Sequence, residues 1–247
     1  MRPSTRLVVL GKKLWTPAQI STDLWLDAAD AITITLHGST VSQWTDKSGN
    51  GRNAFQETSA RQPTLIGNRI QFDGSRFLIC QPGWGNYWEW FLVLKFDRTD
   101  VVQVPIRDSS MPNSTALVGY NVNSSSFYRV RNTANSNYSS SISNEFGTAI
   151  RIHGYSSRTT NIAHAFVDGL EKTNWNVSGD MGTSLYLGIN GTFLLNGIEG
   201  SIYEFVLLSQ EASNSTRQLI EGYLAWKWGL TANLSNDHPF KFNPPLA

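Results

Sequence analysis

The sequence predicts an all-β fold, a two-sheet antiparallel jelly-roll sandwich, with one helix near the C-terminal end. Three observations carry this prediction. Between residues 24 and 208 the chain contains many short runs in which apolar and polar residues alternate, which is the period of a half-buried strand. Turn residues, mainly Gly, Asn, Asp and Ser, separate these runs. After the last run, apolar side chains recur at helical spacing over residues 213–228.

The expected strands follow one another along the chain. Residues 90–96 are nearly all apolar, which suits a central strand buried on both faces. The dipeptide Asp168-Gly169 between two apolar runs indicates a tight hairpin turn. That hairpin is expected over residues 163–170. The remaining strands are expected at residues 24–27, 32–36, 42–44, 69–72, 76–79, 119–123, 126–131, 149–155, 185–190 and 198–208.

The expected helix has signals at both ends. Ser213 or Ser215 can cap its first turn, and Gly229 suits the left-handed residue that ends many helices. We expect its apolar stripe to cover an open end or a sheet edge of the sandwich. The stripe consists of Leu219, Ile220, Tyr223, Leu224 and Trp228.

The 247 residues read as one domain with short extensions, because no charge run or proline-rich linker divides them. We expect an N-terminal arm over residues 1–20, the sandwich with its helix over residues 21–236, and an extended C-terminal tail over residues 237–247. The tail is rich in proline and should lie along a surface, either its own or a partner's.

Five short motifs occur in an order typical of one superfamily. They read WLDAAD at residues 25–30, QWTDKSGNG at 43–51, RQPTL at 61–65, IQFDGS at 70–75 and IEGYLAWKWGL at 220–230. This pattern resembles the concanavalin A-like lectin/glucanase superfamily in its laminin-G-like branch, and more narrowly the domains of tailed-phage virion structural proteins. The resemblance extends from about residue 16 to about residue 245. It implies a concanavalin A-like jelly roll and a place in a virion.

Composition and charge exclude several classes of partner. The formal net charge is +1, so there is no electrostatic case for binding nucleic acid or an anionic membrane. No apolar run reaches the 18 residues that a membrane span needs. Cys80 is the only cysteine, so no internal disulfide is possible, and we expect it to be a small buried side chain.

Catalysis is not indicated. The glucanase branch of the superfamily places carboxylates two residues apart on one strand, as E-x-D-x-x-E, and this pattern is absent here. Glu89 is followed two residues later by Phe91, and Glu204 by Val206. We therefore expect these two carboxylates to be solvated or in turns, and the chain to be no enzyme.

The one cofactor that the sequence suggests is a structural calcium ion. Laminin-G and legume-lectin relatives often hold Ca²⁺ with loop carboxylates and carbonyls, so the resemblance implies that Asp46 with Asn50, or Asp27 with Asp30, could contribute ligands. The same residues also suit tight turns, and no third carboxylate is assignable.

A sugar site is suggested by an aromatic cluster at residues 84–90. Trp84 and Tyr87 could stack on a sugar ring while Asn86 bonds its hydroxyls. The alternative is that Trp88 and Trp90 belong to the core of the following strand, which leaves only Trp84 and Tyr87 in the loop.

Two functions follow as hypotheses. The first is a non-enzymatic bacteriophage structural protein on the virion surface, either a capsid decoration (cement) protein or a tail-associated protein. It would act by packing against other capsid or tail proteins, with several copies associating as a homo-oligomer. The expected contacts are Arg6, Leu7, Val8, Val9 and Leu10, which could add a strand to a neighbour's sheet or to their own, together with Phe240 and Phe242.

The second hypothesis is a carbohydrate-binding module, or lectin, that recognises a host surface glycan. It would belong to a phage, or be secreted or displayed on a bacterial cell surface. A divergent glycan hydrolase or lyase is a third reading, and the missing carboxylate pair argues against it.

Overall fold

The computed structural model describes most of the 247-residue chain. The described residues are 12–83, 89–98, 100–101, 103–108, 115–116, 119–121, 125–131, 137–142, 148–157, 162–176, 184–188 and 197–247. No described helix is both long enough and apolar enough to cross a membrane.

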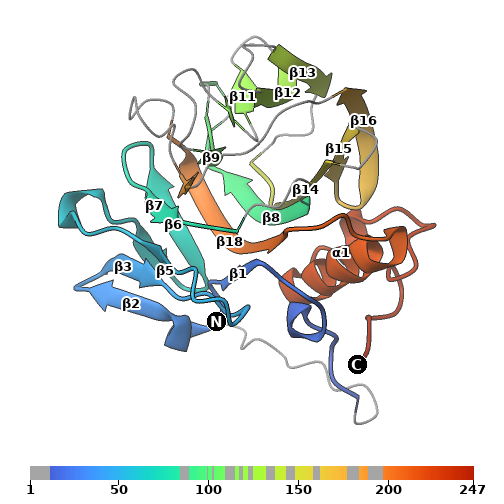
Figure 1. The fold of residues 1–247 in the computed structure, drawn as a ribbon, viewed down its shortest axis with the longest axis horizontal. Helices are drawn as coiled ribbons and strands as arrows, with labels where there is room; N and C mark the ends of the chain where they lie inside the picture. Colours follow the sequence, from blue (N-terminus) through green and yellow to red (C-terminus); the bar gives the residue numbers. More distant parts are fainter. Residues whose placement is uncertain are drawn as a thin grey trace.

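Fifteen of the described strands form one antiparallel sheet, whose path from strand to strand folds back on itself (Figure 1), and two of them branch from that path. One half of the path contains β2 (Ile34–His37), β3 (Thr40–Trp44), β4 (Ala54–Phe55), β5 (Thr64–Ile66), β6 (Arg69–Asp73), β7 (Leu78–Cys80), β9 (Ile106–Asp108), β10 (Thr115–Ala116) and β17 (Leu185–Leu187). The other half contains β1 (Leu24–Asp27), β8 (Glu89–Phe96), β14 (Arg151–Ser157), β15 (Ile162–Val167), β16 (Leu170–Asn176) and β18 (Glu199–Leu208). The strands β11 (Gly119–Asn121), β12 (Ser125–Arg131) and β13 (Asn137–Ile142) pair separately.

Both halves of the path bury side chains in one core. Trp44 and Leu78 from the first half and Leu92 and Phe205 from the second belong to the same buried cluster. The halves are joined where β6 pairs with β18. Because the two halves face each other across shared apolar side chains, the fold is an antiparallel sandwich, as the sequence predicts.

Strand β8 is buried on both faces, which confirms the prediction for residues 90–96. Leu92 and Leu94 point into the sandwich core. Phe91 and Val93 point the other way, into a second apolar cluster beneath the helix.

The helix α1 (Asn214–Trp228) has the predicted ends. The Ser213 hydroxyl accepts the Thr216 N–H at 3.1 Å, and Gly229 adopts the left-handed conformation at φ 73°. The helix covers the outer face of β1, β8 and β18 rather than an open end or edge, so that expectation is wrong. The reason is that these strands carry apolar side chains on both faces and need a cover on the outside as well.

The short connections contain four described 3₁₀ helices, at Pro17–Gln19, Ala31–Thr33, Ser59–Arg61 and Thr231–Asn233. The second replaces the start of the strand expected at residues 32–36, so that β2 begins only at Ile34. This turn leaves Ile32 93% exposed.

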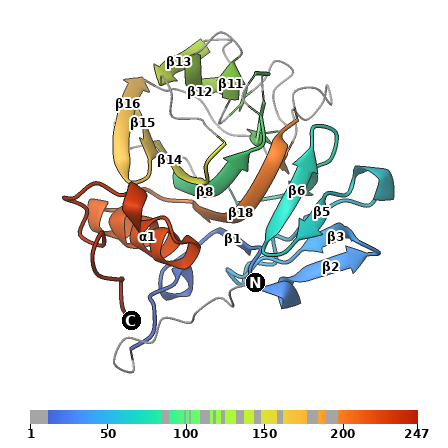
Figure 2. The ribbon, with the colours of Figure 1, turned by 180° about the vertical axis from the view of Figure 1, so that it is seen from behind.

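Both described ends of the chain pack on the helix side. Trp15 is buried in the cluster beneath α1, and its backbone N–H donates to the Pro245 carbonyl at 2.9 Å. Leu14 forms a β-bridge with Leu246. The described part of the expected arm therefore lies against its own domain. Figures 1 and 2 show α1 and the β2–β3 hairpin at opposite sides of the molecule.

Candidate functional site

Among the described residues, two collections of polar side chains bear on function, one closed to solvent and one open to a ligand. The closed one is a buried ionic cluster between the sandwich and α1. Its centre is Glu204, which has no exposed surface. Its Oε1 accepts the Trp25 indole N–H at 2.7 Å and the Tyr223 hydroxyl at 2.8 Å, and its Oε2 accepts the Trp228 indole N–H at 2.7 Å.

Lysines complete this cluster. The Lys227 Nζ lies 2.7 Å from Oε2 of Glu204 and 2.6 Å from Oδ1 of Asp27. The Lys47 Nζ lies 2.9 Å from the second oxygen of Asp27 and 2.7 Å from Asp30. Most members of the cluster come from the sequence motifs at residues 25–30, 43–51 and 220–230, so those motifs hold β1, the 46–51 loop and α1 together.

The electrostatics of the cluster follow from its burial. Burial raises the pKa of Glu204, although Lys227 opposes the shift. Burial alone would also raise the pKa of Asp27, but Lys227 and Lys47 outweigh it and hold that pKa below its usual value. Every oxygen of Glu204 has partners and none is exposed, so the cluster stabilises the fold and offers no place for a substrate.

The expectation that Glu89 and Glu204 are solvated is therefore wrong. Glu89 is 1% exposed, and its Oε2 accepts the Ala212 N–H at 3.2 Å. The sequence alone does not show that a helix covers the outer face of β8 and β18.

The residues expected to bind calcium form a tight turn. Oδ1 of Asp46 accepts the N–H groups of Trp25 and Ser48 at 3.0 and 2.8 Å, and Oδ2 accepts the Ser48 hydroxyl and the Arg52 N–H at 2.7 and 3.1 Å. Asn50 directs its NH₂ group at the carbonyls of Thr22 and Asp23. Asp27 and Asp30 both face Lys47. The described residues contain no group of three or more His, Cys, Asp or Glu placed to hold a metal ion.

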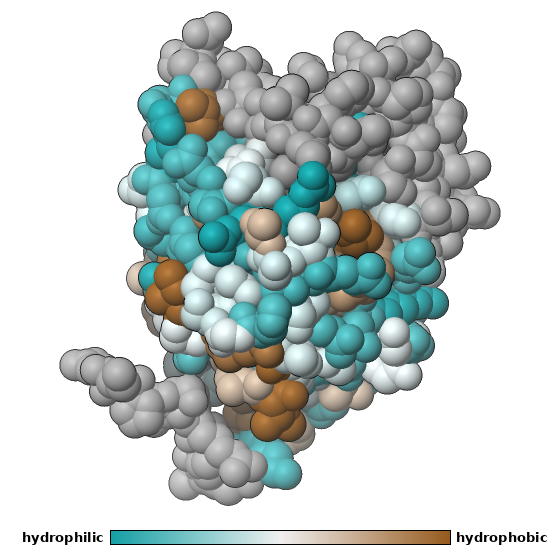
Figure 3. Space-filling view, turned by 90° about the vertical axis from the view of Figure 1, so that its left-hand side faces the viewer, coloured by the Kyte–Doolittle hydropathy of each residue, from teal (hydrophilic) through white to brown (hydrophobic). Residues whose placement is uncertain are grey.

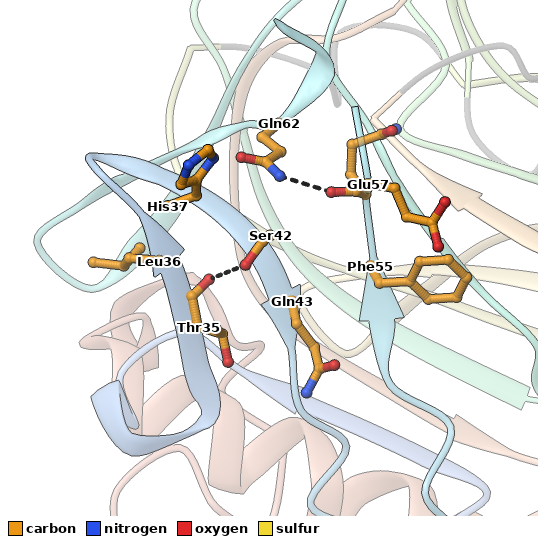
Figure 4. A pocket seen from close by; sticks show the side chains of 9 residues that line it. Thr35, Leu36, His37, Ser42, Gln43, Phe55, Glu57 and Gln62 are labelled. Carbon is orange, nitrogen blue, oxygen red and sulfur yellow. Dashed lines mark hydrogen bonds between the residues drawn. The ribbon is translucent and has the colours of Figure 1, made fainter. Parts of the chain in front are cut away.

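The open site is a groove on the outer face of β2, β3 and β4. Its first hollow has a volume of about 490 Å³, and Figure 4 shows the side chains around it. Its lining consists of Thr35, Leu36, His37, Ser42, Gln43, Phe55, Gln56, Glu57 and Gln62. The surrounding surface is largely polar, with separate apolar patches (Figure 3).

Strand pairing explains why an aromatic ring faces outward here. Trp44 pairs with Ala54, and both are fully buried in the core. The next pair, Gln43 with Phe55, must point to the opposite face because side chains alternate along a strand. Phe55 is 40% exposed as a result, with the Gln43 amide beside it.

The base of the groove is held rigid by hydrogen bonds. The Gln62 side-chain amide donates to the Gln56 backbone carbonyl at 2.8 Å and accepts a hydrogen bond from the Thr40 hydroxyl at 2.7 Å. The Ser42 hydroxyl donates to the Thr35 carbonyl at 3.1 Å. These contacts fix the walls around Phe55 before any ligand arrives.

Other polar groups in the groove have no partner among the described residues. They are the imidazole of His37, the carboxylate of Glu57 and the amide oxygen of Gln43, whose NH₂ group reaches the Thr45 hydroxyl at 3.2 Å. An exposed ring with hydrogen-bonding groups at its edges can bind a molecule that has an apolar face and a polar rim.

A second hollow of about 440 Å³ adjoins the first, since Gln43 and Phe55 line both. Its other lining residues are Gly51, Arg52, Asn53 and Gln81. Arg52 forms an ion pair with the buried Asp23, whose second carboxylate oxygen accepts the Gly83 N–H at 3.0 Å.

The sequence-predicted sugar and arm contacts fall mostly outside the described residues. Trp84, Asn86 and Tyr87 lie there, as do Arg6, Leu7, Val8, Val9 and Leu10. Gln81, three residues before Trp84, lines the second hollow.

The two tail residues have different environments. Phe240 packs against Gly222, and its carbonyl accepts the Trp226 indole N–H at 2.8 Å, so it contacts its own helix. Phe242 is 69% exposed.

Sequence reasoning missed the groove. Gln43 belongs to the motif at residues 43–51, and no pattern in the sequence marks Phe55 as a surface residue. The short Ala54-Phe55-Gln56 segment carries an alternation signal, but apolar residues are exposed too often for one Phe to indicate a surface site.

Comparison with solved structures defines the class of fold. The receptor-binding domain of botulinum neurotoxin D matches with a TM-score of 0.61 at 12% identity, over 81% of this chain and 52% of that one. The serotype D ligand-binding domain in complex with N-acetylneuraminic acid matches with a TM-score of 0.58 at 14% identity, over 81% and 50% of the two chains. A structure of neurotoxin type C, whose cell entry depends on interaction with two ganglioside molecules, matches with a TM-score of 0.60 at 13% identity, over 83% and 51%.

These matches show the fold, a β-sandwich of the kind found in these toxin domains. The chain matches about half the length of each neighbour. No protein-family model matches the sequence, and no curated protein matches it.

Proposed function

We propose that this chain is a non-enzymatic carbohydrate-binding module that recognises a host surface glycan through the groove of β2, β3 and β4. The observation that carries the proposal is the exposed Phe55 ring, set between Gln43 and Glu57 in a hollow of about 490 Å³. The ring supports the proposal because it lies in a hollow beside hydrogen-bonding side chains, and binding sites combine an apolar surface with a few placed polar groups.

The chemistry of a sugar fits this arrangement. A pyranose ring has an apolar face of C–H groups that can lie on the Phe55 ring, and a rim of hydroxyls that both donate and accept hydrogen bonds. The Gln43 amide oxygen, the Glu57 carboxylate and the His37 imidazole supply acceptors, and the amides of Gln43 and Gln81 supply donors. Three of the structural neighbours bear on this reading: one holds N-acetylneuraminic acid, one belongs to a toxin that interacts with gangliosides, and one is a receptor-binding domain.

The absence of catalysis is part of the proposal. Hydrolysis of a glycosidic bond with retention uses two carboxyl groups about 5–5.5 Å apart. Glu57 is the one carboxylate among the described residues that line the two hollows. The buried carboxylates Asp27 and Glu204 are closed off beneath α1 on the other side of the sandwich.

The test is a glycan array followed by titration of the strongest binder. Phe55→Ala should weaken binding by tenfold or more, because the ring supplies the stacking surface. Ile66→Ala is the matched control, since Ile66 is similarly exposed, at 41%, and lines neither hollow. Equal binding by wild type and Phe55→Ala, with both folded by circular dichroism, would rule the groove out.

A virion location is a second proposal, carried by the phage-type motifs and by Ile32. This side chain is 93% exposed on the turn before β2, so contact with a partner would remove its apolar surface from water. The module would then decorate a capsid or tail and bind glycan from that position. Cryo-electron microscopy of purified particles tests this location, and an Ile32→Asp variant that still assembles normally would remove Ile32 as a contact.

A further inference from the structure

We infer that the groove selects neutral oligosaccharides and disfavours sialylated or otherwise anionic ones. This inference rests on the proposed function and names the class of glycan for that same site. It departs from the structural neighbour that holds N-acetylneuraminic acid. The argument comes from the charges that line the two hollows and from their shared boundary at Phe55.

The first hollow presents a negative charge to its ligand. Glu57 is exposed, and its carboxylate has no ion-pair partner among the described residues. His37 is the other ionisable side chain that lines that hollow. A sialic acid carboxylate placed on Phe55 would therefore meet a charge of its own sign.

The second hollow offers no available cation among its described lining residues. Arg52 is its single charged member, and Asp23 neutralises it through their ion pair. Asp23 is 6% exposed, so a ligand that took Arg52 away would leave a buried carboxylate without its partner.

Cations at the margin of the groove are also occupied or directed elsewhere. Arg76 donates to the Gln62 carbonyl at 3.1 Å but is paired with Asp73 at 2.8 Å. Arg61 lies over the Phe77 ring, 5.8 Å from its centroid, and lines neither hollow. Recognition of a carboxylate normally uses an arginine whose N–H groups are available to form two parallel bonds.

The shape of the groove indicates a chain of sugars rather than a single one. The two hollows, of about 490 and 440 Å³, meet at Gln43 and Phe55. A saccharide chain that crosses Phe55 would place one unit near His37 and another near Gln81. The amides of Gln43 and Gln81 are uncharged, which suits hydroxyl and N-acetyl groups.

The experiment compares matched pairs of glycans with the full chain. Calorimetric titration uses neutral oligosaccharides and their sialylated counterparts, for example lactose-terminated chains with and without N-acetylneuraminic acid. The neutral member should bind at least about threefold more tightly at low salt, and the ratio should shrink as salt screens Glu57. Glu57→Lys should reverse the preference, whereas the control Asp237→Asn, which removes an exposed carboxylate outside both hollows, should leave it unchanged.

The variant Gln81→Ala tests whether the bound saccharide extends into the second hollow. This variant should weaken binding of a neutral hexasaccharide and leave binding of the corresponding disaccharide within about twofold of wild type. Equal loss for both lengths, or for neither, would overturn the assignment of a chain that crosses Phe55.

The outcomes separate this inference from the proposed function. Sialylated glycans that bind as tightly as their neutral counterparts, with affinity lost in Phe55→Ala, would overturn the neutral preference and leave the groove as a glycan site. Glycans whose binding is unaffected by Phe55→Ala, or no binding by any member of the set, would overturn both.

Discussion

Replacing Lys227 with Met tests whether the buried ionic cluster holds α1 to the sandwich. The Lys227 side chain is 17% exposed and contacts Asp27 and Glu204, which are almost or completely buried. Methionine keeps most of the packing volume but removes the charge. Asp27 keeps its pair with Lys47, but Glu204 loses its cation. Leaving a buried carboxylate without its cation costs about 3–5 kcal/mol, a large part of the stability of a typical domain.

The pH dependence of this loss identifies its cause. Lys227 opposes the upward shift that burial imposes on the pKa of Glu204, so removing it should raise that pKa further. A carboxyl group with a raised pKa in the folded state binds its proton more tightly there than in the unfolded chain. Stability of the variant should therefore recover as pH falls toward that raised pKa, and the deficit should be smaller at about pH 5.5 than at about pH 7.5.

The assay is urea unfolding followed by tryptophan fluorescence at both pH values. Lys95→Met is the matched control, because Lys95 pairs with Asp97 at 2.6 Å on the surface and should cost less than about 1 kcal/mol. The double variant Lys227→Met/Glu204→Gln should lose less than Lys227→Met alone, since the unpaired charge is gone. A loss below about 1 kcal/mol for Lys227→Met at neutral pH would refute the reasoning.

Three further predictions concern other contacts. Asp46→Ala should destabilise the protein by about 2–4 kcal/mol through the loss of its hydrogen bonds. A chelator should leave the melting temperature of the wild type unchanged, and a melting temperature that falls with chelator would instead indicate a bound cation. Gly222→Ala places a Cβ 2.6 Å from the Cβ of Phe240 and should cost about 1–3 kcal/mol in thermal unfolding, with susceptibility of the tail to carboxypeptidase as a second readout. Burial raises the pKa of the Cys80 thiol, so iodoacetamide should label it in urea but not in the native protein, and rapid native labelling would contradict its burial.

The ends of α1 and the buried strand β8 could be predicted from short sequence signals. The Ser213 cap and the left-handed Gly229 both lie where the residue types indicate a helix start and a helix end. The continuous apolar run of residues 90–96 predicted burial on both faces of β8, and the structure confirms it. In each of these cases the signal lies within a few residues along the chain, although distant elements, α1 and the other strands, bury β8.

Glu204 shows why the rest could not be predicted. Ile202 pairs with Leu94 and Glu204 with Val93, so Tyr203 is an extra residue at a bulge in the pairing of β18 with β8. The bulge turns Glu204 to the same side as Val93, beneath α1. Neither the bulge nor the helix above it can be read from alternation within residues 198–208.

The groove was unpredictable for a related reason. Which face of β4 points outward depends on its pairing with β3 and on the contact of Phe55 with Ile79 in β7, twenty-four residues later in the chain. The charges of the groove also depend on distant partners, since Asp23 neutralises Arg52 from the turn before β1.

The bridge between Leu14 and Leu246 has a mechanical consequence. Residues 13–15 and 245–247 run antiparallel, with the Ala247 N–H donating to the Lys13 carbonyl at 2.9 Å and the Trp15 N–H donating to the Pro245 carbonyl at 2.9 Å. Tension applied between Lys13 and Ala247 would load these bonds one after another, as when a zipper opens, and not all at once in shear. The two ends would peel apart at low force while the sandwich stayed closed, so an attachment through them would give way before the groove was deformed.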